Sequence, residues 1–452
     1  MLKKERDRAS DKEREIDEHP DWEDNRATFV GPDVGQKRGT PMRLESRSAA
    51  TKHTSSRLQA MRMVQEWYSF ALASIVLGLC CLLPPSAPAQ TFTVLHAFTG
   101  RPDGASPHAG LLLDKSGNLY GTTAVGGDIK SGWGTVFKVT SEGQETVLYS
   151  FASGTDGANP QAGLIMDASG NLYGTTSKGG SVPNFGTVFK VSAKGKENVL
   201  FRFNDTDGSG PVGSLVRDAK GNLYGTTQVG AKGYGTVFKL DSKGNETVLH
   251  SFARGADGAF PLAGLIMDAK GNLYGTTESG GTPEVGTVFE VDNTGEETIL
   301  YSFKRAPDGY GPYGGLVMDA IGNFYGTAED GGKDSAFGTV FKLTKSGVET
   351  VLHSFASNPD GANPWAGLIR DAKGNLYGTT SFGGIGKGTV FEVSSEGEET
   401  VLYTFTGGKD GGFPHGGLVM DGEGNLYGTT TEGGDLSCDD GIGCGTVFKL
   451  TP

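Results

Sequence analysis

One position in this 452-residue sequence recurs seven times with a changing side chain, and several of its occupants can do chemistry. It follows the proline of a repeated Asp-Gly-x-x-Pro motif and is filled in turn by His108, Gln161, Val212, Leu262, Tyr313, Trp365 and His415. Aromatic faces beside imidazole and amide groups suit a sugar or another small polar ligand with apolar faces. The candidate ligand-binding residues at this position are therefore His108, Gln161, Tyr313, Trp365 and His415.

A second variable position lies just before a repeated Gly-Thr-Val-Phe motif, where four copies carry an aromatic residue. Trp133 and Tyr234 at this position extend the candidate ligand-binding set. Phe185 and Phe337 occupy it in two other copies, and we expect both, like Phe413, to pack against neighbouring loops. Variable loops on a rigid scaffold are where recognition is usually found.

Catalysis is the alternative reading of the same surface. His108 and His415, together with Glu278, Glu329 or Glu432, have the side chains of a metal or acid–base site, as in a metal-dependent lyase or a lactonase-like hydrolase. No Gly-x-Ser-x-Gly nucleophile motif occurs in the sequence. The leading interpretation is a module that binds a ligand, with a glycan as the candidate class, without turning it over, or that acts as a surface interaction module. A purely structural surface protein is the third possibility.

Two aspartates recur in every copy and are expected to be structural. A ring formed by the first, in Asp-Gly-x-x-Pro, would be able to bind Ca²⁺ or Mg²⁺, but Asp-Gly is also turn chemistry, which we favour, so we expect no cofactor. The second opens an Asp-x-x-Gly-Asn turn and is expected to cap it. The first set is Asp103, Asp156, Asp207, Asp257, Asp308, Asp360 and Asp410, and the second is Asp114, Asp167, Asp218, Asp268, Asp319, Asp371 and Asp421. His96, His250 and His353, outside these motifs, are expected to be surface residues.

The elements that position these residues repeat with them. Gly-Asn-Leu-Tyr-Gly-Thr or a close variant occurs seven times at a spacing of about 51 residues, a period typical of propellers and solenoids. The second copy contains four runs rich in β-branched and aromatic residues between Gly/Asn turns, at 163–167, 172–176, 186–191 and 198–203. The sequence therefore predicts an all-β, seven-bladed β-propeller with four antiparallel strands per blade.

The two ends of the repeat region are complementary. Residues 91–98 resemble an isolated fourth strand, and the last copy ends at residue 450 after its third strand. We expect the N-terminal strand to complete the last blade, closing the ring as three plus one and covering an exposed sheet edge. Because strand directions alternate, the loops that enter the first strand of each blade and the variable loops between its second and third strands are expected on one face.

The region before the repeats divides into two segments. Residues 1–60 are highly charged, without apolar periodicity, and are expected to be a disordered extension or to precede the true start of translation at Met61 or Met63. Residues 61–89 have the pattern of a cleaved signal peptide, because their apolar run is shorter than the roughly 20 residues of a spanning helix. Residues 90–452 form the propeller, which we expect to be secreted, periplasmic or at the cell surface.

Cysteine usage and charge narrow the possibilities further. Cys438 and Cys444, the two cysteines after residue 89, are expected to form a disulfide, since no further ligands lie at zinc spacing. Residues 90–452 contain 26 Lys and Arg against 40 Asp and Glu, a net charge near −14, and no basic patch. This composition argues against nucleic acid or anionic lipid as a partner. We expect a monomer with no membrane contact after signal cleavage.

The repeated strings Gly-Asn-Leu-Tyr-Gly-Thr-Thr, Gly-Thr-Val-Phe-Lys and Glu-Thr-Val-Leu-Tyr-Ser-Phe resemble the bacterial GloVer tandem-repeat family over about residues 91–450. This resemblance implies an exported, surface-associated protein of unassigned biochemical activity. The sequence ends at Thr451-Pro452, so we expect no C-terminal anchor. The phrase Gly-Leu-x-x-Asp-x-x-Gly-Asn-Leu-Tyr is more loosely similar to NHL and streptogramin-lyase-type propellers, with no clear mapping of the lyases' catalytic residues.

Overall fold

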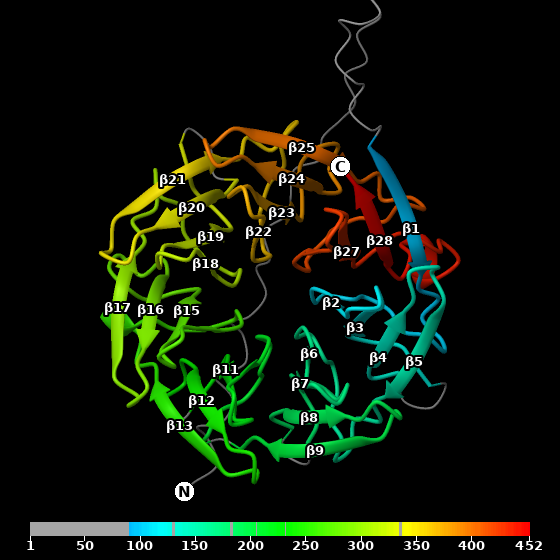
Figure 1. The fold of residues 1–452 in the computed structure, drawn as a ribbon, viewed down its shortest axis with the longest axis horizontal. Helices are drawn as coiled ribbons and strands as arrows, with labels where there is room; N and C mark the ends of the chain where they lie inside the picture. Colours follow the sequence, from blue (N-terminus) through cyan, green and yellow to red (C-terminus); the bar gives the residue numbers. More distant parts are fainter. Residues whose placement is uncertain (1–89, 129–131, 181–183, 205, 231, 334–336) are drawn as a thin grey trace, which may run out of the picture. The chain divides into compact units, whose positions relative to one another are not determined.

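The computed structural model describes residues 90–128, 132–180, 184–204, 206–230, 232–333 and 337–452. Over these residues, seven four-stranded antiparallel sheets follow one another around a ring (Figure 1). The predicted seven-bladed all-β propeller is confirmed. The predicted charged extension (1–60) and signal peptide (61–89) lie outside the described residues.

The strands occupy equivalent places in every blade. The innermost strands are β2 (Leu112–Leu113), β6 (Ile165–Met166), β10 (Val216–Arg217), β14 (Ile266–Met267), β18 (Val317–Met318), β22 (Ile369–Arg370) and β26 (Val419–Met420). The second strands are β3 (Leu119–Thr123), β7 (Leu172–Thr176), β11 (Leu223–Thr227), β15 (Leu273–Thr277), β19 (Phe324–Ala328), β23 (Leu376–Thr380) and β27 (Leu426–Thr430).

The third and fourth strands of each blade are at least as long as its second strand. The third strands are β4 (Thr135–Val139), β8 (Thr187–Val191), β12 (Thr236–Leu240), β16 (Thr287–Val291), β20 (Thr339–Leu343), β24 (Thr389–Val393) and β28 (Thr446–Thr451). The outermost strands are β5 (Glu145–Ser150), β9 (Glu197–Arg202), β13 (Glu246–Ser251), β17 (Glu297–Ser302), β21 (Glu349–Ser354), β25 (Glu399–Thr404) and β1 (Thr91–Ala97). Two 3₁₀ turns, η1 (Gly255–Asp257) and η2 (Asp439–Gly441), lie in loops.

The seventh sheet contains both ends of the described chain. Its order is β1-β28-β27-β26, so the N-terminal strand is outermost and pairs antiparallel with the C-terminal strand. The register runs from Thr91 opposite Thr451 to Ala97 opposite Thr446. Residues about 350 positions apart in sequence therefore hydrogen bond in one ladder.

The innermost strands are shorter than the sequence predicts. Only Ile165 and Met166 of the expected 163–167 run pair in the ladder. The carbonyl of Ala162, just before this run, instead accepts a hydrogen bond of 3.1 Å from Thr122 Oγ1 of the preceding blade. The chain near the centre of the ring thus bonds between blades rather than within one, and six equivalent threonines do the same: Thr175, Thr226, Thr276, Thr327, Thr379 and Thr429.

The hydrophobic core lies between neighbouring blades. Val136 and Phe151 of the first blade pack with Leu164 and Phe189 of the second, and all four are nearly inaccessible to solvent. The rings of Phe151 and Phe189 meet edge to face with centroids 5.1 Å apart. Each blade therefore buries apolar surface only because the next blade covers it.

The predicted turn role of the second aspartate is confirmed. Asp114 Oδ1 accepts hydrogen bonds from the backbone N–H groups of Ser116 and Asn118, and Oδ2 accepts from the Tyr120 hydroxyl at 3.1 Å. The same aspartate–tyrosine bond occurs in the other six blades. The repeated Asp-x-x-Gly-Asn-Leu-Tyr sequence is thus a self-contained turn.

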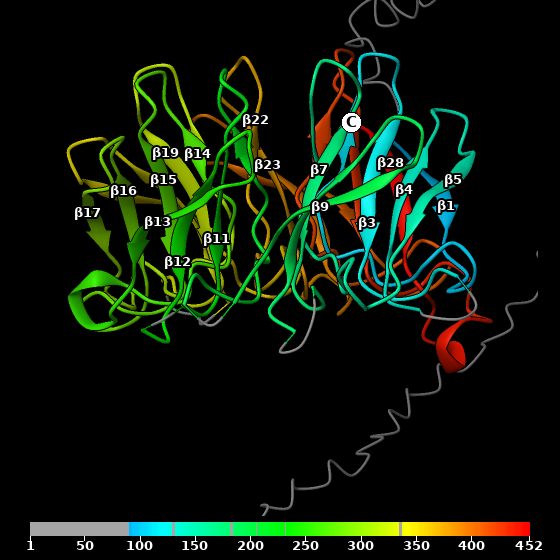
Figure 2. The ribbon, with the colours of Figure 1, turned by 90° about the horizontal axis from the view of Figure 1, so that it is seen from below.

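The loops that enter the innermost strands and those between the second and third strands share one face. They pair with each other in every blade, as in the bridge between Ala158 and Lys178. Figure 2 shows η1 (green) and η2 (red), one from each kind of loop, far apart but both on the lower side of the ring. We call this the variable-loop face, because these loops differ most between copies. No helix among the described residues is long and apolar enough to span a membrane.

Candidate functional site

The backbone places the residue after each proline in an equivalent position. The residue before the proline has a left-handed φ, for example 55° at Asn363, and its N–H donates to the carbonyl of Phe337 in the preceding blade at 2.9 Å. The proline ring packs on the glycine that opens the preceding blade's third strand, as Pro364 does on Gly338. These contacts fix where the next side chain, here Trp365, emerges, and all seven side chains at this position are half-buried.

Four of these seven side chains form a continuous arc. The rings of Tyr313 and Trp365 are stacked with centroids 6.2 Å apart, and the imidazole of His415 lies 4.4 Å from the indole. His108 continues the arc, with its ring centroid 5.3 Å from that of His415. The arc crosses blades five, six, seven and one, so it joins the last blade to the first. We call Tyr313, Trp365, His415 and His108 the aromatic arc.

Two glutamates hold the polar tips of the aromatic residues. The Tyr313 hydroxyl donates to Glu278 Oε1 at 2.7 Å, and the Trp365 indole N–H donates to Glu329 Oε1 at 2.7 Å. Each glutamate belongs to the blade before its partner and follows the second strand directly. Burial raises the pKa of Glu329, and the bond from Trp365 opposes that rise. Burial and the bond to Glu278 raise the pKa of Tyr313, so its hydroxyl stays protonated.

The two histidines of the arc are uncharged at neutral pH. Their Nδ1 atoms lie 3.3 Å apart, so one ring donates and the other accepts. Burial lowers the pKa of His108. Burial, with the adjacent His108, lowers the pKa of His415 to about 3. The arc thus offers two neutral imidazoles and two aromatic rings beside carboxylates.

The remaining candidates lie outside this arc. At the equivalent position the second blade carries Gln161, and the third and fourth blades carry the aliphatic residues Val212 and Leu262. Trp133 is 40 % exposed in a loop of the first blade. Tyr234 packs edge to face on Phe260, with ring centroids 5.9 Å apart. The structure therefore joins Tyr313, Trp365, His415 and His108 but not Gln161, Trp133 or Tyr234.

The sequence reasoning overlooked two residues beside the arc. Phe382, 40 % exposed, lies edge to face with both Trp365 and Phe413. Lys387 Nζ lies 4.4 Å from the centroid of the Phe413 ring. Phe382 stands where other blades carry Val125, Lys178, Val229, Ser279, Asp330 and Glu432, so its variability was a usable signal.

The residues needed for the catalytic alternative do not all converge. Glu432 stands one position beyond that of Glu278 and Glu329, where Thr431 is the equivalent residue, and its backbone pairs with Gly412. Among the described residues, no third His, Cys, Asp or Glu groups with His108 and His415 at a distance suited to one metal ion. The histidine pair therefore has two of the three ligands that a catalytic metal usually takes from protein.

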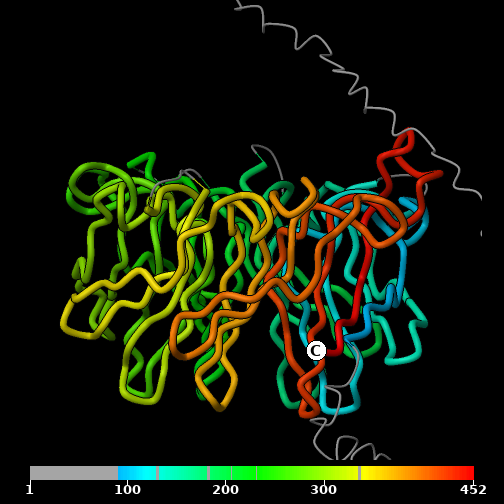
Figure 3. Tube along the Cα trace, turned by 90° about the horizontal axis from the view of Figure 1, so that it is seen from above, coloured from blue at the N-terminus to red at the C-terminus, as the bar shows by residue number. Residues whose placement is uncertain are grey.

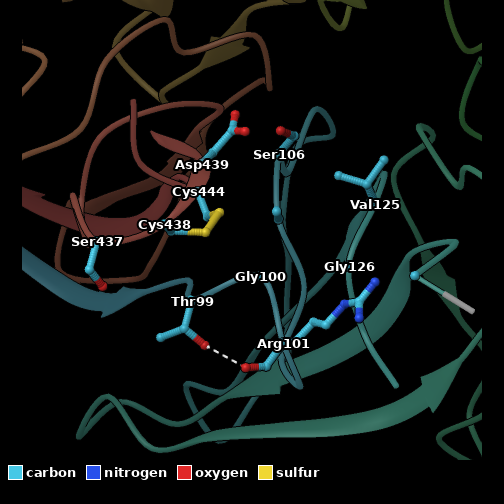
Figure 4. Close-up of a pocket in the computed structure, with 12 residues that line it drawn as sticks. Thr99, Gly100, Arg101, Ser106, Val125, Gly126, Ser437, Cys438, Asp439 and Cys444 are labelled. Carbon is cyan, nitrogen blue, oxygen red and sulfur yellow. Dashed lines mark hydrogen bonds between the residues drawn. A yellow bond between two sulfur atoms is a disulfide. The ribbon is translucent and has the colours of Figure 1, made fainter. Parts of the chain in front are cut away.

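A cavity of about 470 Å³ lies on the variable-loop face between the first and last blades. Cys438 and Cys444 are joined by a disulfide, with Cα atoms 5.7 Å apart, and form part of its wall. Figure 4 shows the sulfurs, Gly100 and Arg101 along this wall, and Figure 3 shows the loop with the disulfide projecting beyond its neighbours. Ser106 also lines the cavity, two residues from His108, so one loop contributes to both the cavity and the arc.

The aspartates of Asp-Gly-x-x-Pro do not gather around the centre of the ring. Asp103 accepts hydrogen bonds from His96 of the outermost strand β1 and from the backbone N–H of Thr99. Asp257 and Asp360 are bonded in the same way to His250 and His353, each with 19 % of its side chain exposed. The alternative hypothesis that these aspartates form a calcium-binding ring is therefore wrong. The expectation that His96, His250 and His353 are simple surface residues is also wrong, because each bonds to an aspartate.

The comparisons with known proteins agree with this architecture. A family model described as the Gloeobacter/Verrucomicrobia repeat matches residues 85–289 and residues 265–452. No curated protein matches the sequence. The extracellular domain of a protein described as a one-component system of B. thetaiotaomicron superposes with a TM-score of 0.50 at 11% identity, over 79% of this chain and 39% of that one. This chain thus spans well under half of that protein's length, and the likeness extends to the fold.

Two other solved structures are similar at lower scores. PorZ, a surface component of the type-IX secretion system of Porphyromonas gingivalis, has a TM-score of 0.47 and 14% identity, over 77% of this chain and 47% of that one. A gluconolactonase from Xanthomonas campestris has a TM-score of 0.41 and 14% identity, over 80% of this chain and 90% of that one.

Proposed function

This chain belongs to the Gloeobacter/Verrucomicrobia repeat family, and we propose that it is an exported propeller that binds a glycan on its variable-loop face without turning it over. The aromatic arc of Tyr313, Trp365, His415 and His108 is the observation that carries the proposal. Export is supported by the signal-peptide pattern in residues 61–89 and by the disulfide between Cys438 and Cys444.

The arc has the chemistry that sugar rings require. Carbon–hydrogen faces of a pyranose stack on indole and phenol rings, while its hydroxyl groups need directed hydrogen-bond partners. Glu278 and Glu329 hold Tyr313 and Trp365 through one carboxylate oxygen each. The second oxygen of each carboxylate would then accept hydrogen bonds from sugar hydroxyls, and the histidine nitrogens would donate or accept them.

The charge of the site favours a neutral sugar or an amino sugar. Glu278, Glu329 and Asp330 lie close enough to Tyr313 for their charges to raise its pKa. Neutral imidazoles leave this negative potential uncompensated, so a uronic or sialic acid would be repelled. Residues 90–452 also carry a net negative charge, which acts in the same direction.

The test is binding of the purified full-length protein to a panel of neutral, amino and acidic glycans. We expect binding to neutral or amino sugars and, for Trp365→Ala, at least a roughly tenfold weaker affinity, because removing one stacking ring costs on the order of 1.4 kcal/mol or more. Trp133→Ala, which removes an exposed tryptophan outside the arc, is the matched control and should leave the affinity unchanged.

The proposal fails if no neutral or amino sugar binds. It also fails if Trp133→Ala and Trp365→Ala weaken binding equally, since the arc would then have no special role. Turnover of any bound glycan would establish the catalytic alternative in its place.

A further inference from the structure

Six blades carry a glutamate with a buried, unpartnered oxygen. Glu145, Glu197, Glu246, Glu297, Glu349 and Glu399 begin the outermost strands, and the Oε1 atom of each has no hydrogen-bond partner in the structure. Each lies near the Asp-Gly-x-x-Pro aspartate of its own blade, at the junction with the preceding blade, as Glu297 does near Asp257. Burial raises the pKa of Glu297 to about 7. A buried carboxylate oxygen without a donor is costly and needs a partner.

At three of these junctions a histidine bonds to the aspartate, through His96, His250 and His353. At two of them the glutamate also lies close enough for the three side chains to form a group. His250, Asp257 and Glu297 form one group, and the donor atoms that they offer lie within 4.8 Å of one another. His250 Nε2 is 2.9 Å from Asp257 Oδ1, and the two side chains are 19 % and 23 % exposed. The residues come from β13, the loop after it, and β17, so the group connects the third blade to the fourth.

The second group is equivalent. His353, Asp360 and Glu399 also offer atoms within 4.8 Å of one another, and they connect the fifth blade to the sixth. His353 Nε2 is 3.1 Å from Asp360 Oδ2, with side chains 19 % and 14 % exposed. Because these side chains are partly exposed, each group can be reached from solvent.

The other junctions show that the imidazole is the variable part. Tyr149 replaces histidine opposite Asp156, and its hydroxyl donates to that aspartate at 2.9 Å. Burial and Asp156 raise the pKa of Tyr149, so this oxygen stays protonated and is not a ligand. The fold therefore accepts Tyr, Phe or His at this position, and only His supplies a nitrogen donor beside two carboxylates.

We propose that His250, Asp257 and Glu297, and likewise His353, Asp360 and Glu399, are two divalent transition-metal sites that link neighbouring blades. One imidazole nitrogen with two carboxylate oxygens is a donor set that Zn²⁺ accepts, with its remaining position filled by water. Ligands at Zn²⁺ distances are about 3.3 Å apart around a tetrahedral ion. Small side-chain rotations bring the three donors to that spacing, and the unpartnered Glu oxygen gains a cation.

The matched variants follow from the repeat itself. His250→Tyr and His353→Tyr install the residue that the fold already accepts at Tyr149, and they remove only the nitrogen ligand. The purified full-length protein is stripped with a chelator and dialysed against Zn²⁺, and bound metal is counted by elemental analysis. Each single variant should bind one ion fewer than the parent, and the double variant two fewer.

Two further measurements decide the proposal. Zn²⁺ should raise the thermal midpoint of the parent but not that of the double variant, because an ion that binds only the folded state stabilises it. Tyr149→His should gain one ion, since it recreates the group with Asp156 and Glu197. Equal zinc content in the parent and the double variant would overturn the proposal, as would a midpoint that zinc leaves unchanged in both or a Tyr149→His protein that gains no ion.

Discussion

In six of the seven Asp-Gly-x-x-Pro motifs the aspartate joins an outermost strand to the next blade, and in the seventh Asp207 accepts from Asn204 of the preceding loop. Tyr403 donates to Asp410 at 3.0 Å, whereas at the equivalent places His250 and His353 contact Asp257 and Asp360. The motif therefore has a structural role in every copy, as the turn chemistry of Asp-Gly suggested. The partner on the strand, and not the aspartate, distinguishes one junction from another.

The buried glutamates beside these aspartates make stability depend on pH. Burial raises the pKa of Glu197 from 4.5 to about 7. The folded state thus binds a proton more tightly than the unfolded state, and this contribution to stability is complete below pH 4.5 and lost as the pH rises through about 7. A shift of this size corresponds to about 3 kcal/mol without screening, and to the order of 1–2 kcal/mol at this half-buried site.

We predict that Glu197→Gln stabilises the protein at pH 8, by the order of 1–2 kcal/mol, and changes little at pH 4.5. The reason is that glutamine has no charge to bury at high pH and resembles the protonated glutamate at low pH. Thermal midpoints of the parent and variant, measured from pH 4.5 to 8, test this. Parallel curves for the two proteins would contradict it.

The loop that carries each candidate side chain depends on a glycine in the preceding blade. Gly286 opens β16 with a φ of 110°, and a Cβ placed there would lie 2.5 Å from Pro312 Cδ and 2.7 Å from Thr277 O. Pro312 immediately precedes Tyr313. Packing between a third strand and the next loop thus positions one end of the aromatic arc.

Gly286→Ala should destabilise the protein by more than the about 1–3 kcal/mol that a left-handed alanine costs, because the Cβ also meets backbone and proline. It should also weaken any ligand affinity that depends on Tyr313. Gly424→Ala is the control, since Gly424 has a φ of 88° and nothing within 4 Å of the added Cβ. Urea unfolding of both variants provides the comparison, and equal losses would show that the clash is absent.

The sixth and seventh blades meet at Phe92, a residue that departs from the repeat. Phe92 pairs with Leu450 in the register position that glutamate occupies in the other outermost strands, as Glu399 does opposite Val393. Its ring stacks on Tyr403 with centroids 3.9 Å apart and an interplanar angle of 8°. The junction of the sixth and seventh blades therefore replaces a buried acid with an aromatic stack.

Phe92→Ala should destabilise the whole propeller by roughly 2 kcal/mol, less than the 3–5 kcal/mol of a fully buried phenylalanine because Phe92 is half-buried. Since β1 and β28 pair, we expect amide hydrogen exchange to accelerate in both strands. Hydrogen exchange with mass spectrometry checks this, with Phe201→Ala at another junction as the comparison. Acceleration confined to β1 would contradict a shared ladder.

The strands and turns could be predicted because their causes are local. β-branched and aromatic runs bounded by Gly and Asn give β3, β7 and their equivalents, and an aspartate four residues before its asparagine closes each turn. The repeat then multiplies one blade by seven. The ends of the innermost strands could not be predicted, since a hydrogen bond from the neighbouring blade replaces the ladder there.

The amino-acid sequence alone therefore determined the blade and the face with variable loops, which follow from short-range patterns, and the number of blades, which follows from counting the repeats. It also named the residues of the aromatic arc individually, and their binding of a ligand stays a prediction. Which of them meet depended on the packed ring, which brings His108 and His415 together across 307 residues and leaves Trp133 and Tyr234 apart. The His–Asp–Glu groups emerged in the same way, because each combines residues of two adjacent blades, and the repeat does not show which of its positions meet across a blade junction.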